Sequence, residues 1–353
     1  MPPASQLAGV TGRSGQGKPS PRPALDPVGR EMLPCQATSP KLTDSPESGI
    51  IVFWGIMQFL FTNIYGLLRT LRPRQWIKNG FLFMALLFDQ KLFNWPLLTR
   101  AFFAFILFCM ISSVVYIVND LADLEKDKLH PKKRRRALPS GQLKPWFAVV
   151  SAVGILAVCL PLSFWLDFYF GLIVLFYFLL NVSYSFCLKH VVIIDVMVVA
   201  AGYVLRVAAG VIVAQAERFS PWLYVCTIFL ALFLAIGKRR HELTFLADQA
   251  NSHRKILNEY TVQFLDEMSH VVTAGAVTSY SLYTFSATNL PSSHAMMLTI
   301  PFVIYVIFRY QYLVHVKGEG GAPEMLLYTD LPFLLALILW ATSVVVIMYI
   351  FNP

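Results

Sequence analysis

Long apolar runs recur along most of this chain, and each is close to the roughly 20 residues that an α-helix needs to cross a bilayer. Hydrophobic residues make up 56% of the sequence and charged residues only 14%, whereas a soluble domain of this length carries more charge. We therefore predict an all-α integral membrane protein, a bundle of about nine transmembrane helices. The predicted spans cover approximately residues 79–95, 100–118, 147–166, 169–186, 191–213, 220–237, 270–289, 295–313 and 331–351.

Two segments precede this bundle. Residues 1–48 are rich in Pro, Gly and Ser and have little periodic apolar pattern, so we expect a disordered N-terminal tail. Residues 49–78 should form an interfacial helix and a basic juxtamembrane segment, because Gln58 and Asn63 interrupt the apolar run. A tenth span is the alternative for this run. Residues 79–353 would then form the transmembrane catalytic domain.

Basic residues are concentrated in the loops after the even-numbered spans, above all in 126–144 and 238–255. Loops of this kind usually stay in the cytoplasm, so these loops and the N-terminus should be cytoplasmic. We predict a multi-pass protein of the cell inner (plasma) membrane whose active site faces the cytoplasm. Topology and phosphate binding then explain the net charge of +9, so this charge does not indicate a nucleic-acid-binding protein. The sequence leaves open whether the chain forms a homo-oligomer.

An acidic motif directly follows the second predicted span and consists of Asn119, Asp120, Asp123 and Asp127. If the helix continues at about 100° per residue, the three carboxylates and the amide share one face. Anions at that spacing repel one another, so the face favours a divalent cation, and oxygen-only ligands favour Mg²⁺ or Ca²⁺ over zinc. Because Mg²⁺ usually completes its shell with substrate phosphates, we predict a Mg²⁺ cofactor held by these four residues. A solvated acidic helix end is the alternative.

A basic run, residues 132–136, comes directly after the acidic motif. Acidic side chains can hold a metal while basic ones hold phosphate oxygens, so Lys133 and Arg136 are candidate phosphate ligands. Lys78 at the start of the first span and Lys189 at the end of the fourth could reach a phosphate as point charges. The alternative for these residues is structural, as topology signals, headgroup contacts or snorkelling side chains.

Two charged residues lie inside the fifth predicted span. Asp195 falls a little inside its start, and Arg206 falls near its middle. Charges at that depth are costly and usually face the interior of a bundle. An internal Asp195–Arg206 ion pair is one arrangement that the sequence allows.

The acidic motif, with Lys133 and Arg136 ahead of a Pro-Ser-Gly turn, resembles the first metal motif of the UbiA-type membrane prenyltransferase superfamily. The resemblance extends over roughly residues 69–351. It implies a UbiA-like helical bundle with a cavity that faces the cytoplasm and a side opening to lipid.

Further motifs resemble one branch of this superfamily, the polyprenyl-phosphate phosphoribosyltransferases. They are Arg72-Pro-x-Gln75-Trp76-x-Lys78-Asn79, Tyr184-Ser-x-x-Leu-Lys189-His190 with Asp195, Gly237-Lys238-Arg239 with Glu242-Leu243, and Phe308-Arg309-Tyr310 ahead of Gly-Gly-x-Pro-Glu324. Ordinary prenyl-transferring members resemble each other in a second carboxylate cluster after the sixth span. This chain instead has Lys238, Arg239 and Arg240 there, which suits a donor that carries more phosphate charge.

The resemblance implies Mg²⁺-dependent transfer of the 5-phosphoribosyl group from phosphoribosyl pyrophosphate to a polyprenyl phosphate in the membrane, with release of pyrophosphate. The alternative is a prenyltransferase that moves an isoprenoid chain from its diphosphate to an aromatic acceptor. The implied catalytic residues are Asp123, Asp127, Tyr184 and Lys189, and the implied substrate-binding residues are Arg72, Lys78, Lys133, Arg136, Lys189, Lys238, Arg239 and Glu242. A transporter would place its acidic residues near the bilayer midplane, whereas these lie at one end of a span.

Overall fold

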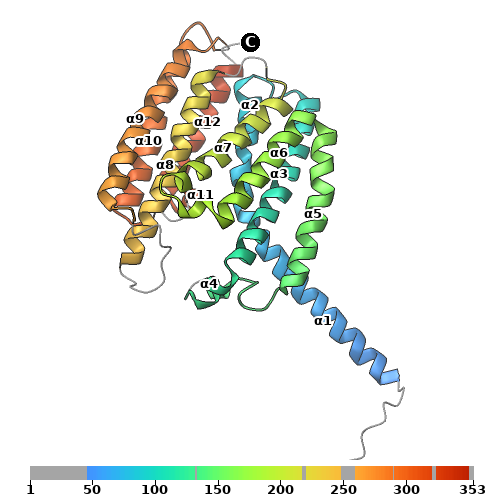
Figure 1. The fold of residues 1–353 in the computed structure, drawn as a ribbon. Helices are drawn as coiled ribbons and strands as arrows, with labels where there is room; N and C mark the ends of the chain where they lie inside the picture. Colours follow the sequence, from blue (N-terminus) through green and yellow to red (C-terminus); the bar gives the residue numbers. More distant parts are fainter. Residues whose placement is uncertain are drawn as a thin grey trace, which may run out of the picture. The chain divides into compact units, whose positions relative to one another are not determined.

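Every element of regular secondary structure in the described residues is a helix, as expected from the apolar runs (Figure 1). The computed structural model describes residues 46–131, 133–216, 220–247, 259–288, 290–319 and 323–349. By its contacts the chain divides into two units, Met1–Val52 and Phe53–Pro353, and the packing below concerns the second. Residues 1–45 of the predicted tail lie outside the described residues.

The helices fall into two groups along the chain. The first comprises α1 (Pro46–Thr70), η1 (Pro73–Phe83), α2 (Met84–Phe88), α3 (Trp95–Ala122), α4 (Leu124–Leu129), η2 (Lys133–Arg135), α5 (Pro145–Leu166), α6 (Phe168–Phe186), η3 (Leu188–His190) and α7 (Ile194–Val213). The second comprises α8 (Pro221–Ala247), α9 (Val262–Ser286), η5 (Ala295–Thr299), α10 (Ile300–His315), α11 (Pro323–Thr329) and α12 (Leu331–Tyr349). The 3-10 segments are labelled η.

Seven helical stretches in the described residues are long and apolar enough to cross a membrane. They are Trp95–Ala122, Pro145–Leu166, Phe168–Phe186, Ile194–Val213, Pro221–Thr244, Ala295–His315 and Leu331–Tyr349. Each coincides with a predicted span, which agrees with a multi-pass membrane protein. The count of about nine is not confirmed, because the predicted spans over 79–95 and 270–289 do not meet these criteria.

Local sequence features explain why these two predicted spans do not form long apolar helices. The first is helical only as far as Phe88, because Asp89 and Lys91 form an ion pair of 2.7 Å there and Gln90 turns the backbone with a φ of +56°. The other lies in α9, which begins earlier, at Val262, and its predicted stretch contains polar residues such as Ser279, Ser281 and Thr284. Polar residues therefore shorten one apolar run and dilute the other.

Helix α7, the last helix of the first group, packs against other helices of that group and against α8 of the second, and so joins the two groups (Figure 1). On one side it contacts η1, α2, α3 and α6, with a core that includes Leu82, Phe108 and Phe170. On the other it contacts α8, and the core there includes Ile236 and Phe333. The side chains of both cores are buried, so α7 is the fixed element between the two helix groups.

The contact between η1 and α7 is unusually close. A Cβ atom added to Gly210 of α7 would lie only 2.1 Å from the carbonyl oxygen of Leu82 in η1, so only glycine allows this approach. One turn earlier on α7, Arg206 Nε donates a 2.7 Å hydrogen bond to Oδ1 of Asn79. These two contacts hold η1, and with it the neighbouring Lys78, against α7.

Helix α1 covers most of the predicted interfacial segment. Asn63 Oδ1 accepts a 2.9 Å hydrogen bond from the backbone N–H of Lys144, and Arg69 donates to Gln142 at 2.9 Å. Helix α1 is not among the seven stretches in the described residues that could span a membrane. Its interfacial position stays a prediction.

Candidate functional site

A polar cavity of about 330 Å³ lies where the ends of α3, α6 and α8 meet. Its walls come from segments far apart in the sequence, and α7, the residue preceding η1 and the segment at η2 complete them. We call it the polar cavity. It is lined by Arg72, Val115, Tyr116, Asn119, Asp123, Lys133, Arg136, Asn181, Tyr184, Ser185, Val196, Val199, Ala235, Lys238, Arg239 and Glu242.

Most of the predicted site residues lie in this lining. Those that do are Arg72, Asn119, Asp123, Lys133, Arg136, Tyr184, Lys238, Arg239 and Glu242. Asp120, Asp127 and Lys189 are buried and contact lining residues from behind. Lys78 lines a second cavity, described below. The basic side chains in the polar cavity outnumber its two carboxylates, Asp123 and Glu242, so a ligand with several negative charges would suit it.

The acidic motif is divided by a helix end. Helix α3 ends at Ala122, and Asp123 caps it with φ −98° and ψ 7° before α4 begins. The continuous helix predicted through Asp127 is therefore wrong at this point. The Asp123 carbonyl still accepts a 2.8 Å hydrogen bond from the Asp127 N–H, which keeps the two segments together.

Each carboxylate of the motif is paired with a basic side chain. Nη1 of Arg136 bridges Asp120 at 3.0 Å and Asp127 at 2.6 Å, and Arg72 contacts Asp120 at 2.6 Å. Lys189 Nζ donates to Asp123 Oδ1 at 2.7 Å, and both side chains are buried. Lys189 thus neutralises Asp123 and sets its direction.

Arg239 has two carboxylate partners. Its guanidinium contacts Asp195 at 2.7 Å and Glu242 at 2.5 Å. The Asp195–Arg206 pair that the sequence allowed is therefore replaced by an Asp195–Arg239 pair. Arg206 instead donates to Asn79, to the Tyr177 hydroxyl and to the carbonyl of Gly202.

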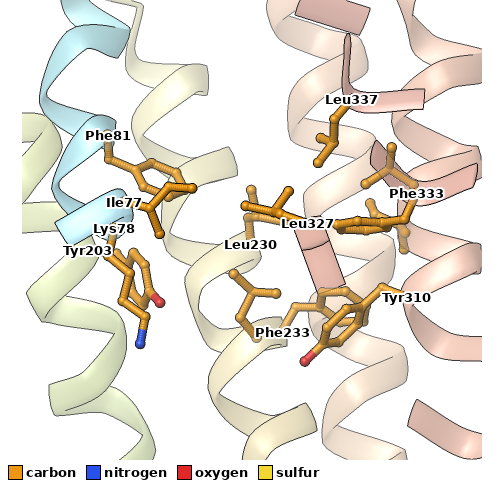
Figure 2. Close-up of a pocket in the computed structure, with 13 residues that line it drawn as sticks. Ile77, Lys78, Phe81, Tyr203, Leu230, Phe233, Tyr310, Leu327, Phe333 and Leu337 are labelled. Atoms are coloured by element: carbon orange, nitrogen blue, oxygen red, sulfur yellow. The ribbon is translucent and has the colours of Figure 1, made fainter. Parts of the chain in front are cut away.

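A second, mostly apolar cavity of about 220 Å³ lies beside the polar cavity along α7 and α8 (Figure 2). We call it the apolar cavity. Lys78 lies at its lower edge in Figure 2, with its amine nitrogen pointing downward. The lining consists of Ile77, Lys78, Phe81, Tyr203, Leu230, Phe233, Leu234, Val306, Ile307, Tyr310, Leu327, Phe333 and Leu337.

The two cavities follow one another along α7 and α8. On α8, Leu234 lines the apolar cavity and the next residue, Ala235, lines the polar one. On α7, Tyr203 lines the apolar cavity and Val199, one turn earlier, lines the polar one. A charged cavity and a cavity that suits a hydrocarbon chain therefore lie next to each other along these two helices.

This arrangement, a polar cavity formed by a motif of the type N-D-x-x-D-x-x-x-D at the end of an apolar helix bundle, has a match among known families. The sequence model of the UbiA prenyltransferase family matches residues 80–327. The chain belongs to the UbiA prenyltransferase family.

Curated relatives of this UbiA family member share most of its length. A decaprenyl-phosphate phosphoribosyltransferase of Corynebacterium glutamicum is 31% identical over 290 residues, which are 81% of this chain and 87% of that protein. The decaprenyl-phosphate phosphoribosyltransferase of Mycolicibacterium smegmatis is 29% identical over 297 residues, 80% of this chain and 92% of that protein.

Solved structures share the fold. A UbiA homolog from Archaeoglobus fulgidus bound to DMAPP and Mg²⁺ superimposes with a TM-score of 0.61 and 18% sequence identity. The match covers 80% of this chain and 98% of that one. At this identity the likeness shows that the helix arrangement is the UbiA fold.

The donor atoms of this UbiA site suit Mg²⁺ by their chemistry. Asn119 and Asp123 line the polar cavity, and amide and carboxylate oxygens are ligands that Mg²⁺ prefers. Within the described ranges no three His, Cys, Asp or Glu side chains come together to hold a metal ion. The carboxylates of the acidic motif form ion pairs with Arg72, Arg136 and Lys189 instead, so phosphate oxygens of a ligand would have to complete the shell of a metal ion.

Sequence reasoning missed several polar residues of this UbiA site. Tyr116 and Asn181 line the polar cavity about one helical turn before Asn119 and Tyr184. That spacing was the available signal, because residues three or four apart share a helix face. Tyr260 lies behind the cavity and had no such signal, because its partners are distant in the sequence.

Proposed function

We propose that this protein transfers the 5-phosphoribosyl group from phosphoribosyl pyrophosphate to a polyprenyl phosphate and releases pyrophosphate. The main support is the adjacency of a cavity rich in basic side chains and an apolar cavity along α7 and α8. The first suits a sugar with several phosphates and the second a lipid chain. Relatives that cover about 80% of the chain are named for this same donor group and a lipid acceptor.

The donor would occupy the polar cavity. Phosphoribosyl pyrophosphate carries a diphosphate at C1 and a phosphate at C5, so it needs basic residues on two sides. Lys133 and Arg136, beside the acidic motif, would bind the diphosphate. Lys238 and Arg239, on α8, would bind the 5-phosphate.

The acceptor would place its tail in the apolar cavity and its phosphate at the junction of the two cavities. Lys78 lines the apolar cavity and lies close enough to Lys238 for the two ammonium groups to interact electrostatically. The acceptor phosphate on Lys78 and the 5-phosphate on Lys238 would relieve their repulsion. We therefore assign the acceptor phosphate to Lys78 and leave the 5-phosphate to the α8 residues.

In the reaction, an oxygen of the acceptor phosphate forms a bond to C1 of the ribose as the bond from C1 to pyrophosphate breaks. The acceptor phosphate is anionic at neutral pH, so no strong general base is required. Lys133 and Arg136 hold the leaving group in line with the acceptor. A Mg²⁺ ion held by Asn119 and Asp123, with Asp120 and Asp127 in support, would supply charge to stabilise the departing pyrophosphate.

Two residues predicted as catalytic have more specific proposed roles. Lys189 does not line the polar cavity and would act through Asp123, whose carboxylate it holds. Tyr184, on α6, lines the polar cavity and would contact the sugar phosphate of the donor. The basic loops around the cavity support a site at the cytoplasmic side of the inner membrane, by the positive-inside rule.

The decisive experiment supplies purified protein with radiolabelled phosphoribosyl pyrophosphate and polyprenyl phosphates, and in parallel with a prenyl diphosphate and an aromatic acid. We expect label in the lipid fraction, release of pyrophosphate and loss of both on chelation of Mg²⁺. In the same assay Lys78→Met should raise the KM for the lipid more than the KM for the donor. Transfer only in the parallel reaction would instead establish the prenyltransferase alternative, and the absence of pyrophosphate release would favour transport.

A further inference from the structure

Arg239 reaches the polar cavity with its guanidinium held from behind. It is 5% exposed, and one terminal nitrogen contacts Asp195 at 2.7 Å while the other contacts Glu242 at 2.5 Å. Asp195 is fully buried in the first turn of α7. The contact with Glu242 is a hydrogen bond and the contact with Asp195 is an ion pair, and together they restrict the position of the guanidinium.

Tyr260 continues this chain of contacts away from the cavity. Its hydroxyl donates to Asp195 Oδ1 at 2.7 Å and accepts the backbone N–H of Ile193 at 2.7 Å. Burial and the hydrogen bond with Asp195 raise the pKa of Tyr260 to about 12, so the hydroxyl keeps its proton and remains the donor. Tyr260 lies just before α9 and thus joins the start of that helix to the start of α7.

The backbone at the start of α7 is strained where Tyr260 holds it. Ile193 has a φ of +70°, a conformation that β-branched residues rarely adopt. Such strain persists only where surrounding contacts impose it. The hydrogen bond from Ile193 to Tyr260 is one such contact, and it fixes the residue two positions before Asp195.

The side chain of Arg239 lines the polar cavity, where its terminal N–H groups can meet a ligand. Its Nε is buried and has no hydrogen-bond partner among the described residues, so it is not the atom that faces the cavity. An oxygen of a phosphate ester would accept from the terminal N–H groups and would also match the charge of the guanidinium.

We propose that Tyr260 and Asp195 are positioning residues for substrate binding, which hold Arg239 so that its guanidinium faces a phosphate oxygen of the donor. The inference rests on the proposed function, because it takes the 5-phosphate of phosphoribosyl pyrophosphate as the ligand. Tyr260 and Asp195 touch no substrate themselves. Their effect is on the affinity for the phosphate, and the bond-breaking step depends on other residues.

Tyr260→Phe is the variant that tests this, because it removes only the hydroxyl. Asp195→Asn would leave a buried guanidinium with one carboxylate and is expected to impair folding. Without its hydroxyl, the KM for phosphoribosyl pyrophosphate and the Kd for ribose 5-phosphate should both rise about three- to tenfold, as expected for one misaligned hydrogen bond. The KM for the lipid and kcat should change less than twofold.

Tyr280→Phe is the matched control. Tyr280 is another buried tyrosine and lies on α9. Its hydroxyl forms hydrogen bonds with Thr299 and Trp340, away from both cavities. The Tyr280→Phe variant should lose about as much thermal stability as Tyr260→Phe and should keep the wild-type KM for the donor. A rise in that KM equal to the rise in Tyr260→Phe would overturn the proposal, because it would indicate a general loss of packing.

A double-mutant cycle with Arg239→Lys shows whether Tyr260 acts through Arg239. A lysine has no planar guanidinium to orient, so Tyr260→Phe should have no further effect on donor affinity in that background. An undiminished effect there, or an unchanged KM in the single variant, would overturn the proposal. If wild-type protein does not use phosphoribosyl pyrophosphate, the proposed function fails, and the Kd for ribose 5-phosphate still decides the positioning role.

Discussion

At the scale of single residues, the acidic motif combines side chains that face the cavity with side chains that hold its basic residues in place. Asp120 and Asp127 are almost fully buried and share the guanidinium of Arg136. Breaking such a buried pair from one side leaves an uncompensated charge. Asp123 differs, because it both lines the polar cavity and pairs with Lys189. We therefore expect its substitution to affect chemistry most directly.

Asp123→Asn should lower kcat for phosphoribosyl transfer on the order of 10²-fold, because the variant loses an anionic oxygen for Mg²⁺ and leaves Lys189 without its carboxylate. The measurement is pyrophosphate release with labelled donor, accompanied by thermal unfolding in detergent. Glu125→Gln is the control, since that carboxylate is exposed and contacts Lys128 outside the cavity. Near-normal turnover in Asp123→Asn would contradict the metal-binding role.

At the scale of elements, the site depends on how η1 meets α7. Lys78 is on η1, and its neighbour Asn79 bonds with Arg206 in the interior of α7. The absence of a side chain at Gly210 lets the backbone of η1 approach α7. The wall of the apolar cavity is therefore positioned by one glycine and one buried arginine on α7, neither of which lines a cavity.

Gly210→Ala should destabilise the protein by about 1–3 kcal/mol or more, because the new methyl group would overlap the Leu82 carbonyl oxygen and push η1 away. A lower thermal midpoint and a higher KM for the lipid acceptor are the expected results. Gly154→Ala on α5 is the comparison, because a Cβ there has no neighbour within 4 Å and alanine favours a helix. Equal stability of the two variants would contradict the close packing of η1 on α7.

The elements also show what the sequence could and could not predict. Apolar runs are local signals, so seven of the predicted spans correspond to long apolar helices. The break in α3 at Asp123 could not be read from the periodicity, which continues through it. The pairing of Asp195 with Arg239, and of Arg206 with Asn79 across 127 positions, depends on helix packing that no local pattern contains. Motif residues could therefore be placed in one cavity, but their partners could not.

At the scale of the whole molecule, the bundle has two chemically different ends. Helix α3 runs between them. Near its start Arg100 pairs with Asp167 at 2.7 Å, and at its other end Asp123 pairs with Lys189. The basic residues of the polar cavity gather at the second end. If the proposed function holds, that end must face the compartment that supplies the soluble donor.

Cysteine accessibility tests this orientation. Glu125→Cys reports on the cavity end and Trp165→Cys, at the end of α5, on the opposite one, because both positions are exposed. Both are made with Cys35 and Cys187 replaced by serine, since Cys187 is itself exposed. In intact cells a membrane-impermeant maleimide should label Trp165→Cys and should reach Glu125→Cys only after permeabilisation. The reverse pattern would place the polar cavity outside the cytoplasm and would contradict the orientation that the positive-inside rule predicts.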